Sequence, residues 1–206
     1  MPSITRKTAS GRTRRDAVQA ELLDAVERLL EAGESYTSLG VQRICDEAGV
    51  ARSAFYTNFA NKSELLLAAV ESVMENVFAG SRGWALADPL PGKKALEATM
   101  ANTLRNWRAH APVLRAYFEV SAYDHEVAHF WRGQFASIID AIQKRIESEQ
   151  HRRRIPKRLD PRTMAEVIVY SGERLAAEHI ATKDATHDPA LARQTAEIIW
   201  RLLYGT

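Results

Sequence analysis

The residues that could do chemistry most directly are His125, Glu126 and His129, which form the His-Glu-x-x-His pattern of zinc hydrolases. On a helix, two histidines four positions apart share a face and can bind one zinc ion. The glutamate between them could act as the general base for a zinc-bound water. Taken alone, the pattern allows a zinc-dependent hydrolase.

The third zinc ligand that this chemistry needs has no good candidate. The extended form of the motif places a glycine and a histidine where this chain has Arg132 and Phe135. Glu147 and Glu149 lie far along the same predicted helix, which rises about 1.5 Å per residue and cannot bring them back. We keep the zinc hydrolase as the alternative hypothesis and expect no catalytic residue, no metal site and no cofactor.

A pair of short predicted helices offers a different chemistry, the binding of DNA. Residues 40–59 have the sequence GVQRICDEAGVARSAFYTNF. Cys45 and Ala48 are small enough to let two helices cross closely, and Gly49 can take the positive φ of a tight turn. The arrangement predicts a helix-turn-helix, and its alternative is a plain helical hairpin with an exposed polar face.

The second helix of this pair should turn its polar side toward DNA, because Val50, Phe55 and Phe59 are expected to pack inward. Arginine can read guanine and asparagine adenine, serine and threonine are permissive, and alanine can approach a thymine methyl group. Tyr56 and Lys62 suit phosphate contacts, which set the register of the protein on the duplex. The predicted DNA-binding residues are Arg52, Ser53, Ala54, Tyr56, Thr57, Asn58 and Lys62.

The segment RICDEAGVARSAFYTNFANKSELLLAAV resembles the signature of the TetR-family repressors, and the match extends over about residues 17–75. The family pattern runs Ile-Ala-x-x-Ala-Gly-Val-Ser, then Tyr-x-x-Phe, then Lys-x-x-Leu-Leu. The resemblance implies a homodimer that places two recognition helices in successive major grooves of a palindromic operator. It also implies a C-terminal domain whose last two helices form a four-helix dimer bundle.

Two positions depart from the family pattern. Ala51 stands before the recognition helix and Gly40 before the preceding helix, where the family usually has serine or threonine. Each change removes a hydroxyl that commonly contacts a phosphate, and losing such a cap typically costs about 1 kcal/mol. We expect Gln42 and Arg43 to take over part of this phosphate contact, and we add them to the predicted DNA-binding residues.

The rest of the chain repeats at helical spacing and predicts an all-α fold of about nine helices. The first helix should span about residues 15–32, and a long helix after residue 61 should end near 79. A break at 80–94, with Asp88-Pro89 and Pro91-Gly92, separates it from the later helices. These are predicted at 93–109, 112–122, 124–151, 160–182 and 189–204.

Three parts are expected along the chain: a flexible basic arm at 1–15, a helix-turn-helix domain at 16–62, and an effector-binding and dimerisation domain at 63–206. The arm has five basic residues and no acid, and could be either solvated or in contact with phosphate. Cys45 is the single cysteine, which fits a reducing cytoplasm. No apolar run reaches the length of about 18 residues that a transmembrane helix needs, so we expect no membrane partner.

The C-terminal part is rich in aromatic residues at helical spacing. Any one of them could simply belong to the core, but apolar, aromatic-lined spaces between helices are typical ligand sites. We therefore predict a largely apolar, elongated effector. The predicted ligand-binding residues are Trp107, Phe118, Tyr123, Trp131, Phe135, Tyr170 and Glu173.

Part of this region is similar to the mycobacterial repressor that controls ethionamide activation. The similarity rests on Ala109-His110, Glu126-Val127-Ala128 with Trp131, and Glu173-Arg174. It implies that Trp107, Trp131 and Phe135 line an elongated channel. The two channel asparagines of that repressor fall here at Val169 and Gly172, so a different ligand is expected.

The family resemblance also implies that helices 160–182 and 189–204 pair across a dimer axis. The candidate interface residues are Ile168, Leu175, Ile198, Ile199, Leu202 and Leu203, some of which could serve the monomer core instead. In the expected mechanism, the effector favours a dimer whose recognition helices no longer match the operator spacing. The protein would then be a cytoplasmic repressor that its effector releases from DNA.

Overall fold

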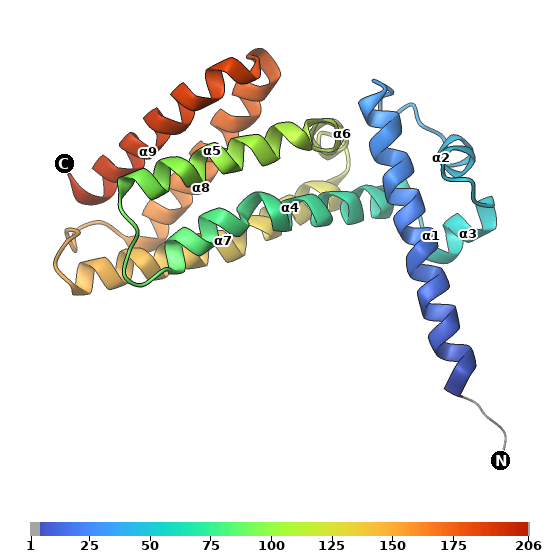
Figure 1. Cartoon of the computed structure of the whole chain (residues 1–206), viewed down its shortest axis with the longest axis horizontal. Helices are drawn as coiled ribbons and strands as arrows, with labels where there is room; N and C mark the ends of the chain where they lie inside the picture. Colours follow the sequence, from blue (N-terminus) through green and yellow to red (C-terminus); the bar gives the residue numbers. More distant parts are fainter. Residues whose placement is uncertain (1–4, 206) are drawn as a thin grey trace. The chain divides into compact units, whose positions relative to one another are not determined.

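The structure, a computed structural model, describes residues 5–205, with the side chains of residues 14–205 other than Glu75 and Trp131. Over this range the chain is helical and contains no strand, which confirms the predicted all-α fold (Figure 1). The α-helices are α1 (Thr5–Glu31), α2 (Val41–Ala48), α3 (Arg52–Asn58), α4 (Lys62–Leu86), α5 (Lys93–Ala109), α6 (Ala111–Ser121), α7 (His125–His151), α8 (Pro161–Thr182) and α9 (Asp188–Tyr204). A short 3-10 helix, Ala185–His187, precedes α9.

The chain divides into two compact units. The first unit contains the residues up to Ser72 together with Pro112–Phe130, and the second contains Val73–Ala111 together with the residues from Trp131 on. The divisions fall inside α4, α7 and the first turn of α6, so these helices contribute residues to both units. No helix in the described part of the chain is long and apolar enough to cross a membrane.

In the first unit, α1, α2 and α3 pack against one another around one apolar core. Leu22, Val26 and Leu29 project from one face of α1, and each is almost completely buried. The helix ends at Gly33, whose φ of +89° is a conformation that a side chain rarely adopts.

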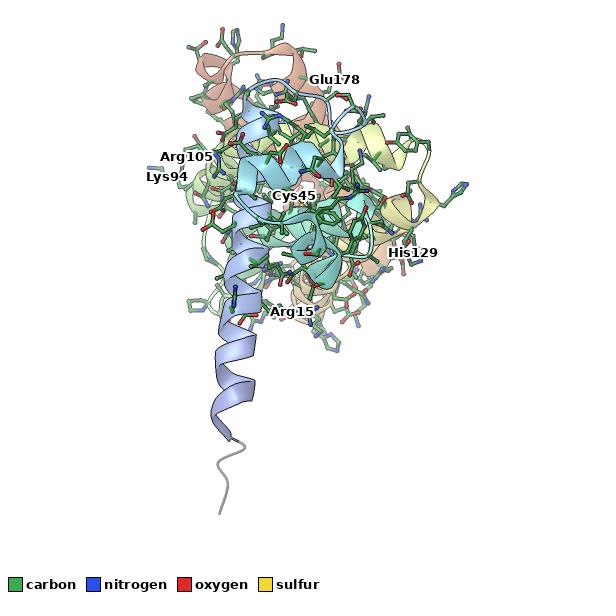
Figure 2. All side chains as sticks on the ribbon, turned by 90° about the vertical axis from the view of Figure 1, so that its right-hand side faces the viewer. Arg15, Cys45, Lys94, Arg105, His129 and Glu178 are labelled. Carbon is green, nitrogen blue, oxygen red and sulfur yellow. The ribbon has the colours of Figure 1, made fainter. Side chains whose placement is uncertain are left out.

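The N-terminal end of α1 differs from the predicted arm. The helix begins at Thr5, so residues 5–15 are helical, and residues 1–4 lie outside the described part. A helix anchored by a buried face can lengthen by one hydrogen bond for each residue that it fixes, so extension costs little. Arg14 and Arg15 are exposed on this helix, and Figure 2 shows Arg15 on α1.

The long helix α4 also runs further than predicted, to Leu86 and not to residue 79. Trp84 and Ala85 continue its buried face past the two glycines at which the sequence predicted a break. The helix ends just before Asp88-Pro89, because proline disfavours helical backbone in the residue before it. The prediction gave too much weight to glycines that tertiary packing overrides.

A buried ionic cluster ties together three segments of the second unit. Glu149 on α7 is completely buried, and its carboxylate lies 3.4–3.6 Å from the guanidinium groups of Arg145, Arg152 and Arg154. Arg145 also donates from Nε to the carbonyl oxygen of Ala85, at 2.8 Å. Two arginines of the basic run 152–158 therefore have an acidic partner.

Candidate DNA-binding surface and effector cavity

The turn between α2 and α3 follows from small residues at the helix crossing. Ile44 and Cys45 on α2 and Phe55 on α3 are completely buried in the first unit. Gly49 ends α2 with a φ of +65°, and the amide of Val50 donates to the carbonyl of Cys45 at 3.0 Å. Figure 2 shows Cys45 on α2, and burial raises the pKa of its thiol. Cys45 therefore serves packing and not thiol chemistry.

Four of the predicted DNA-binding residues form an exposed polar face on α3. Arg52, Ser53, Tyr56 and Thr57 are all exposed, and the ring of Tyr56 keeps about half of its surface, 49%, in solvent. The guanidinium of Arg52 lies over the Tyr56 ring at 5.6 Å from its centroid, and it donates to the Tyr56 hydroxyl at 3.4 Å. The α3 face therefore presents a cation and a phenol side by side, one helical turn apart.

Ala54 and Asn58 are half-buried and lie at the edge of this face. The amide nitrogen of Asn58 donates to the carbonyl of Ala54 at 2.8 Å, while its buried oxygen has no partner in the described structure. Asparagine reads adenine by using its donor and its acceptor together. Because this oxygen is buried, the position of Asn58 does not support the predicted contact with adenine.

Lys62 lies at the N-terminal end of α4, and its ammonium group binds the loop between α1 and α2. It donates to the carbonyl oxygens of Tyr36, Thr37 and Leu39 at 3.0, 3.4 and 2.5 Å. Burial lowers the pKa of this ammonium, and the hydroxyl of Tyr36 donates back to the Lys62 carbonyl at 2.5 Å. An ammonium has three donors, all used here, so the predicted phosphate contact finds no support in this geometry.

On α2, Gln42 and Arg43 are exposed, as a phosphate contact requires, but both already have acidic partners. Gln42 donates to Asp46 at 2.8 Å, and Arg43 lies 3.0 Å from Glu34 and 3.1 Å from Glu47. Exposed pairs of this kind are weak and can be exchanged for a phosphate.

The helix starts in this region lack capping side chains. Neither Gly40 before α2 nor Ala51 before α3 gives a side-chain hydrogen bond to its helix. Both residues are exposed.

The loop between α1 and α2 is also held by the corner between α6 and α7, within the first unit. Glu119 accepts hydrogen bonds from the Ser35 hydroxyl at 2.6 Å and from the Thr37 amide at 3.3 Å. Tyr123 shares a hydrogen bond of 2.9 Å with the Thr37 hydroxyl. The two donors lower the pKa of Glu119, so the carboxylate stays ionised and keeps accepting them. Sequence reasoning missed Glu119, because nothing local shows that the chain returns to this loop.

A largely apolar cavity lies within the second unit, between α4, α5, α7, α8 and α9. The empty space in it, together with the part of it that is open to solvent, is about 880 Å³. Trp107 and Glu173 of the predicted ligand-binding residues line it, as do Val169 and Gly172. The composition of the lining suits an apolar small molecule.

Phe118, Tyr123, Phe135 and Tyr170 are not among the described residues that line this cavity. Phe118 and Tyr123 belong to the first unit, and the side chain of Trp131 lies outside the described part. Phe135 is buried, and its ring packs edge-on against Phe78 and Tyr170. An aromatic residue at helical spacing gives no information on which side of its helix the cavity forms.

Most of the residues of α4 and α5 that line the cavity were not named by sequence reasoning. Leu96, Met100, Leu104 and Trp107 follow one another along one face of α5, and all four line the cavity. This face was visible as an apolar stripe at helical spacing. Only the position of α4 opposite it shows that the stripe lines a cavity.

The polar groups that line the cavity on α4 and α5 are few. The hydroxyls of Ser81 and Thr103 lie 3.3 Å apart, and the Thr99 hydroxyl donates to the carbonyl of Ala95 at 2.9 Å. Trp84 is 8% exposed, and its indole N–H has no acceptor within the described structure. A buried donor that remains unpaired typically costs about 1–3 kcal/mol.

The predicted dimer residues divide into two groups. Ile198 is 63% exposed, and Leu175 and Leu202 are also exposed, which an interface between copies would require, and Leu175 in addition lines the cavity. Ile168, Ile199 and Leu203 are buried and line the cavity, so they serve the second unit itself.

The zinc pattern occupies the first turns of α7. His125, Glu126 and His129 are all exposed. Among the residues whose side chains are described, no three His, Cys, Asp or Glu side chains come together to hold a metal. The geometry therefore gives the hydrolase alternative no support.

Comparisons with known proteins match both halves of the chain. The family described as "Bacterial regulatory proteins, tetR family" matches residues 22–69, and "Transcriptional regulator EthR, C-terminal domain" matches residues 96–205, more than half of the chain. The regulator EthR of Mycolicibacterium smegmatis is 24% identical over 198 residues, which cover 96% of this chain and 91% of that protein.

Solved structures of regulators share the fold. FadR of Bacillus subtilis, solved with stearoyl-CoA, has a TM-score of 0.71 and 16% identity over 87% of this chain and 96% of its own. NalD, a secondary repressor of a multidrug efflux pump in Pseudomonas aeruginosa, has a TM-score of 0.68 and 18% identity over 92% and 98%.

Proposed function

Because the chain belongs to the TetR family of transcriptional regulators and carries a C-terminal domain of the EthR type, we propose that it is a repressor released from its operator by a lipophilic small molecule. Proteins of this kind are regulators and not enzymes. In our proposal, residues 16–62 bind DNA, and residues 63–206 bind the effector and dimerise. The protein would act in the cytoplasm, where it has access to the chromosome.

The exposed polar face of α3 is the observation on which the DNA-binding proposal rests. Phe55 fixes the inner side of this short helix in the core, and Arg52, Ser53, Tyr56 and Thr57 remain outside. A helix held in this way can enter the major groove and present its side chains to base edges. Arg52 would read a guanine, and the hydroxyl of Tyr56 would bind a phosphate.

The effector proposal rests on the cavity in the second unit. Its lining is mostly aliphatic and aromatic, and the described residues that line it include no lysine, arginine or histidine. An elongated apolar molecule would bury its surface there at little polar cost. That a fatty acyl-CoA is bound in the solved FadR structure agrees with an apolar ligand in this fold.

The dimer proposal rests on apolar side chains that α8 and α9 leave exposed. Leu175, Ile198 and Leu202 would pack against the same residues of a second copy, as a two-fold interface requires. Two recognition helices about 34–36 Å apart would then match successive major grooves of a palindromic operator.

Release follows if the effector binds the two states of the dimer unequally. A ligand with equal affinity for both states would shift nothing. The helix α4 contributes residues to both units, so it is the element through which we expect the cavity to change the DNA-binding unit.

A DNA-binding titration with the protein's own upstream region tests this function. We expect salt-sensitive affinity, which Tyr56→Ala weakens on every duplex alike and Arg52→Ala weakens mainly on the preferred sequence. Arg105→Ala is the matched control, because it removes the same charge from an exposed position in the second unit. If Arg52→Ala and Tyr56→Ala both bind like the wild type, α3 is not the DNA-reading helix. Stoichiometric zinc in the purified protein, with a hydrolase activity lost in His129→Ala, would revive the alternative.

A further inference from the structure

A basic loop joins α7 to α8 in the second unit (Figure 1). Residues 152–158 contain five basic residues and no acidic residue. Two of these arginines share the buried carboxylate of Glu149. Arg153, Lys157 and Arg158 are exposed and form no ion pair with any residue that the structure describes. These three residues, which we call the loop cations, are therefore available to an anion outside the protein.

The backbone at Arg153 has an uncommon conformation. Its φ is +59°, and in the described part of the chain it is the only residue other than glycine with a positive φ. The Arg153 amide donates to the carbonyl of Gln150 at 3.1 Å, and the Arg154 amide donates to the carbonyl of Glu149 at 2.9 Å. A helix end of this kind favours glycine, because a residue with a side chain is strained at positive φ.

The same chain uses glycine where it ends two other helices in this way. Gly33 after α1 and Gly49 after α2 have a positive φ and the equivalent pair of backbone hydrogen bonds, with lengths of 3.0–3.3 Å. Glycine would hold the turn after α7 with less strain, so the turn itself does not account for an arginine at position 153. The guanidinium group is what glycine lacks, and a strained residue on the surface favours a binding role for its side chain.

The backbone of this loop is held in place by the rest of the second unit. Ile155 is 3% exposed and anchors the middle of the loop. The side-chain amide of Gln150 donates to the carbonyl oxygens of Pro156 at 3.1 Å and of Leu159 at 2.8 Å. The loop cations therefore extend from an ordered backbone, so binding an anion would restrict only their side chains.

Among anionic partners, the phosphate backbone of DNA suits the loop cations best. Arginine binds a phosphate through two parallel hydrogen bonds, and lysine binds it as a point charge. A membrane surface is less suitable, because segments that lie on one combine cations with apolar side chains, and the aliphatic residue of this loop, Ile155, is buried. A protein already bound to an operator meets neighbouring DNA at a high local concentration.

We propose that the loop cations bind the phosphate backbone of a second segment of duplex DNA while α3 is on the operator. The contact has no sequence preference, because phosphates are present in every sequence. The loop and α3 belong to different units and share no residue, so the two contacts do not compete for the same side chains. The protein thereby brings two stretches of DNA together. This inference rests on the proposed function, because it requires a protein bound to its operator.

Capture of a second duplex by operator-bound protein tests the inference. The full-length protein is loaded on an immobilised duplex from its own upstream region, and a labelled duplex of unrelated sequence is then titrated. We expect wild type to capture the labelled duplex with an affinity that falls as salt rises. In the triple variant Arg153→Gln, Lys157→Gln, Arg158→Gln, capture should weaken about 10-fold or more, and the slope of log affinity against log salt should become shallower by about three counterions. Loading on the upstream duplex should stay unchanged.

The triple variant Lys94→Gln, Arg105→Gln, Lys183→Gln is the matched control, because it removes three positive charges from exposed positions of the same unit. It should capture the labelled duplex like the wild type. Arg153→Gly separates the side chain from the turn that it occupies. This variant should weaken capture while its melting temperature stays unchanged or rises, because glycine relieves the strain of the positive φ.

The possible failures separate this inference from the proposed function. If wild type loads on the upstream duplex but captures no second duplex, or if the loop variants capture it as well as the control does, the loop cations do not bind DNA although the regulator remains supported. If wild type captures no duplex but binds vesicles of phosphatidylglycerol and phosphatidylcholine through the loop cations, the partner is a membrane surface and our inference is wrong. If wild type does not load on the upstream duplex, the proposed function fails, and this inference fails with it.

Discussion

The first unit and the cavity of the second unit differ in whether their polar groups have hydrogen-bond partners. In the first unit, polar side chains are bonded to the loop between α1 and α2: Lys62 binds three of its carbonyls, and Glu119 accepts from two of its donors. In the cavity, Trp84 keeps a buried donor without a partner. Fixed geometry suits a surface that reads a rigid duplex, whereas the cavity has a mostly apolar lining that suits an apolar molecule.

Packing beneath α3 should give the largest effect. Phe55→Ala removes a completely buried ring and should lower the free energy of unfolding by about 3–5 kcal/mol, with loss of DNA binding. Its neighbour Tyr56 is the matched control, because Tyr56→Ala changes an exposed ring and should alter stability by only about 0.5 kcal/mol. Urea unfolding followed by circular dichroism measures both. Equal losses for the two variants would show that α3 is not oriented as described.

A partly buried ion pair in the second unit should give the next effect. The guanidinium of Arg108 donates to Asp188 at 2.6 and 2.9 Å, and it holds the pKa of that carboxyl below its ordinary value of 3.8, with help from His179. Asp188→Asn should cost roughly 1.5–3 kcal/mol at pH 7, which is typical of hydrogen bonds to charged groups.

The pH dependence of this effect has a definite sign. Because the folded pKa of Asp188 is lowered, its stabilisation is complete above the unfolded pKa and disappears as the pH falls through the folded pKa. The stability difference between wild type and Asp188→Asn should therefore be constant at neutral pH and shrink below about pH 4. A difference that grows on acidification would contradict the ion pair.

Lys62 gives a smaller effect with a more specific signature. Lys62→Met leaves three carbonyls without their charged donor and should cost about 1–3 kcal/mol. Removing a phosphate contact would make the slope of log affinity against log salt shallower by about one counterion. Because Lys62 binds loop carbonyls and not a phosphate in our account, we expect Lys62→Met to leave this slope unchanged. Lys94→Met controls for the lost charge, because Lys94 is exposed in the second unit. A shallower slope for Lys62→Met alone would restore the phosphate contact.

The two regions also differ in how well the sequence predicted them. The helices α2 and α3 depend on local signals, such as Gly49 in the turn and the small Cys45 at the crossing, so their bounds and buried face were predictable. The role of Lys62 was not, because it depends on a loop more than twenty residues earlier that folds back over the start of α4.

The cavity depends on residues from five helices that are distant in sequence. Trp107, one of the predicted ligand-binding residues, lines the cavity on the apolar face of α5. Tyr123 is also an aromatic residue predicted to bind the ligand, but its hydroxyl shares a hydrogen bond with Thr37 in the first unit. Trp84 was not among the predicted ligand-binding residues, and it lies in the segment where the sequence predicted a break and α4 continues. Periodicity identifies the face of a helix, and only the packing of the other helices decides what that face meets.

The most direct measurement titrates a labelled duplex from the upstream region with the protein, at fixed salt, with and without saturating 2-nonanone. The ketone should weaken DNA binding, and the same duplex should weaken ketone binding by an equal factor, because coupling between two binding sites is reciprocal. A ketone that binds in the cavity while duplex affinity stays unchanged would contradict release of the operator by an effector at this site.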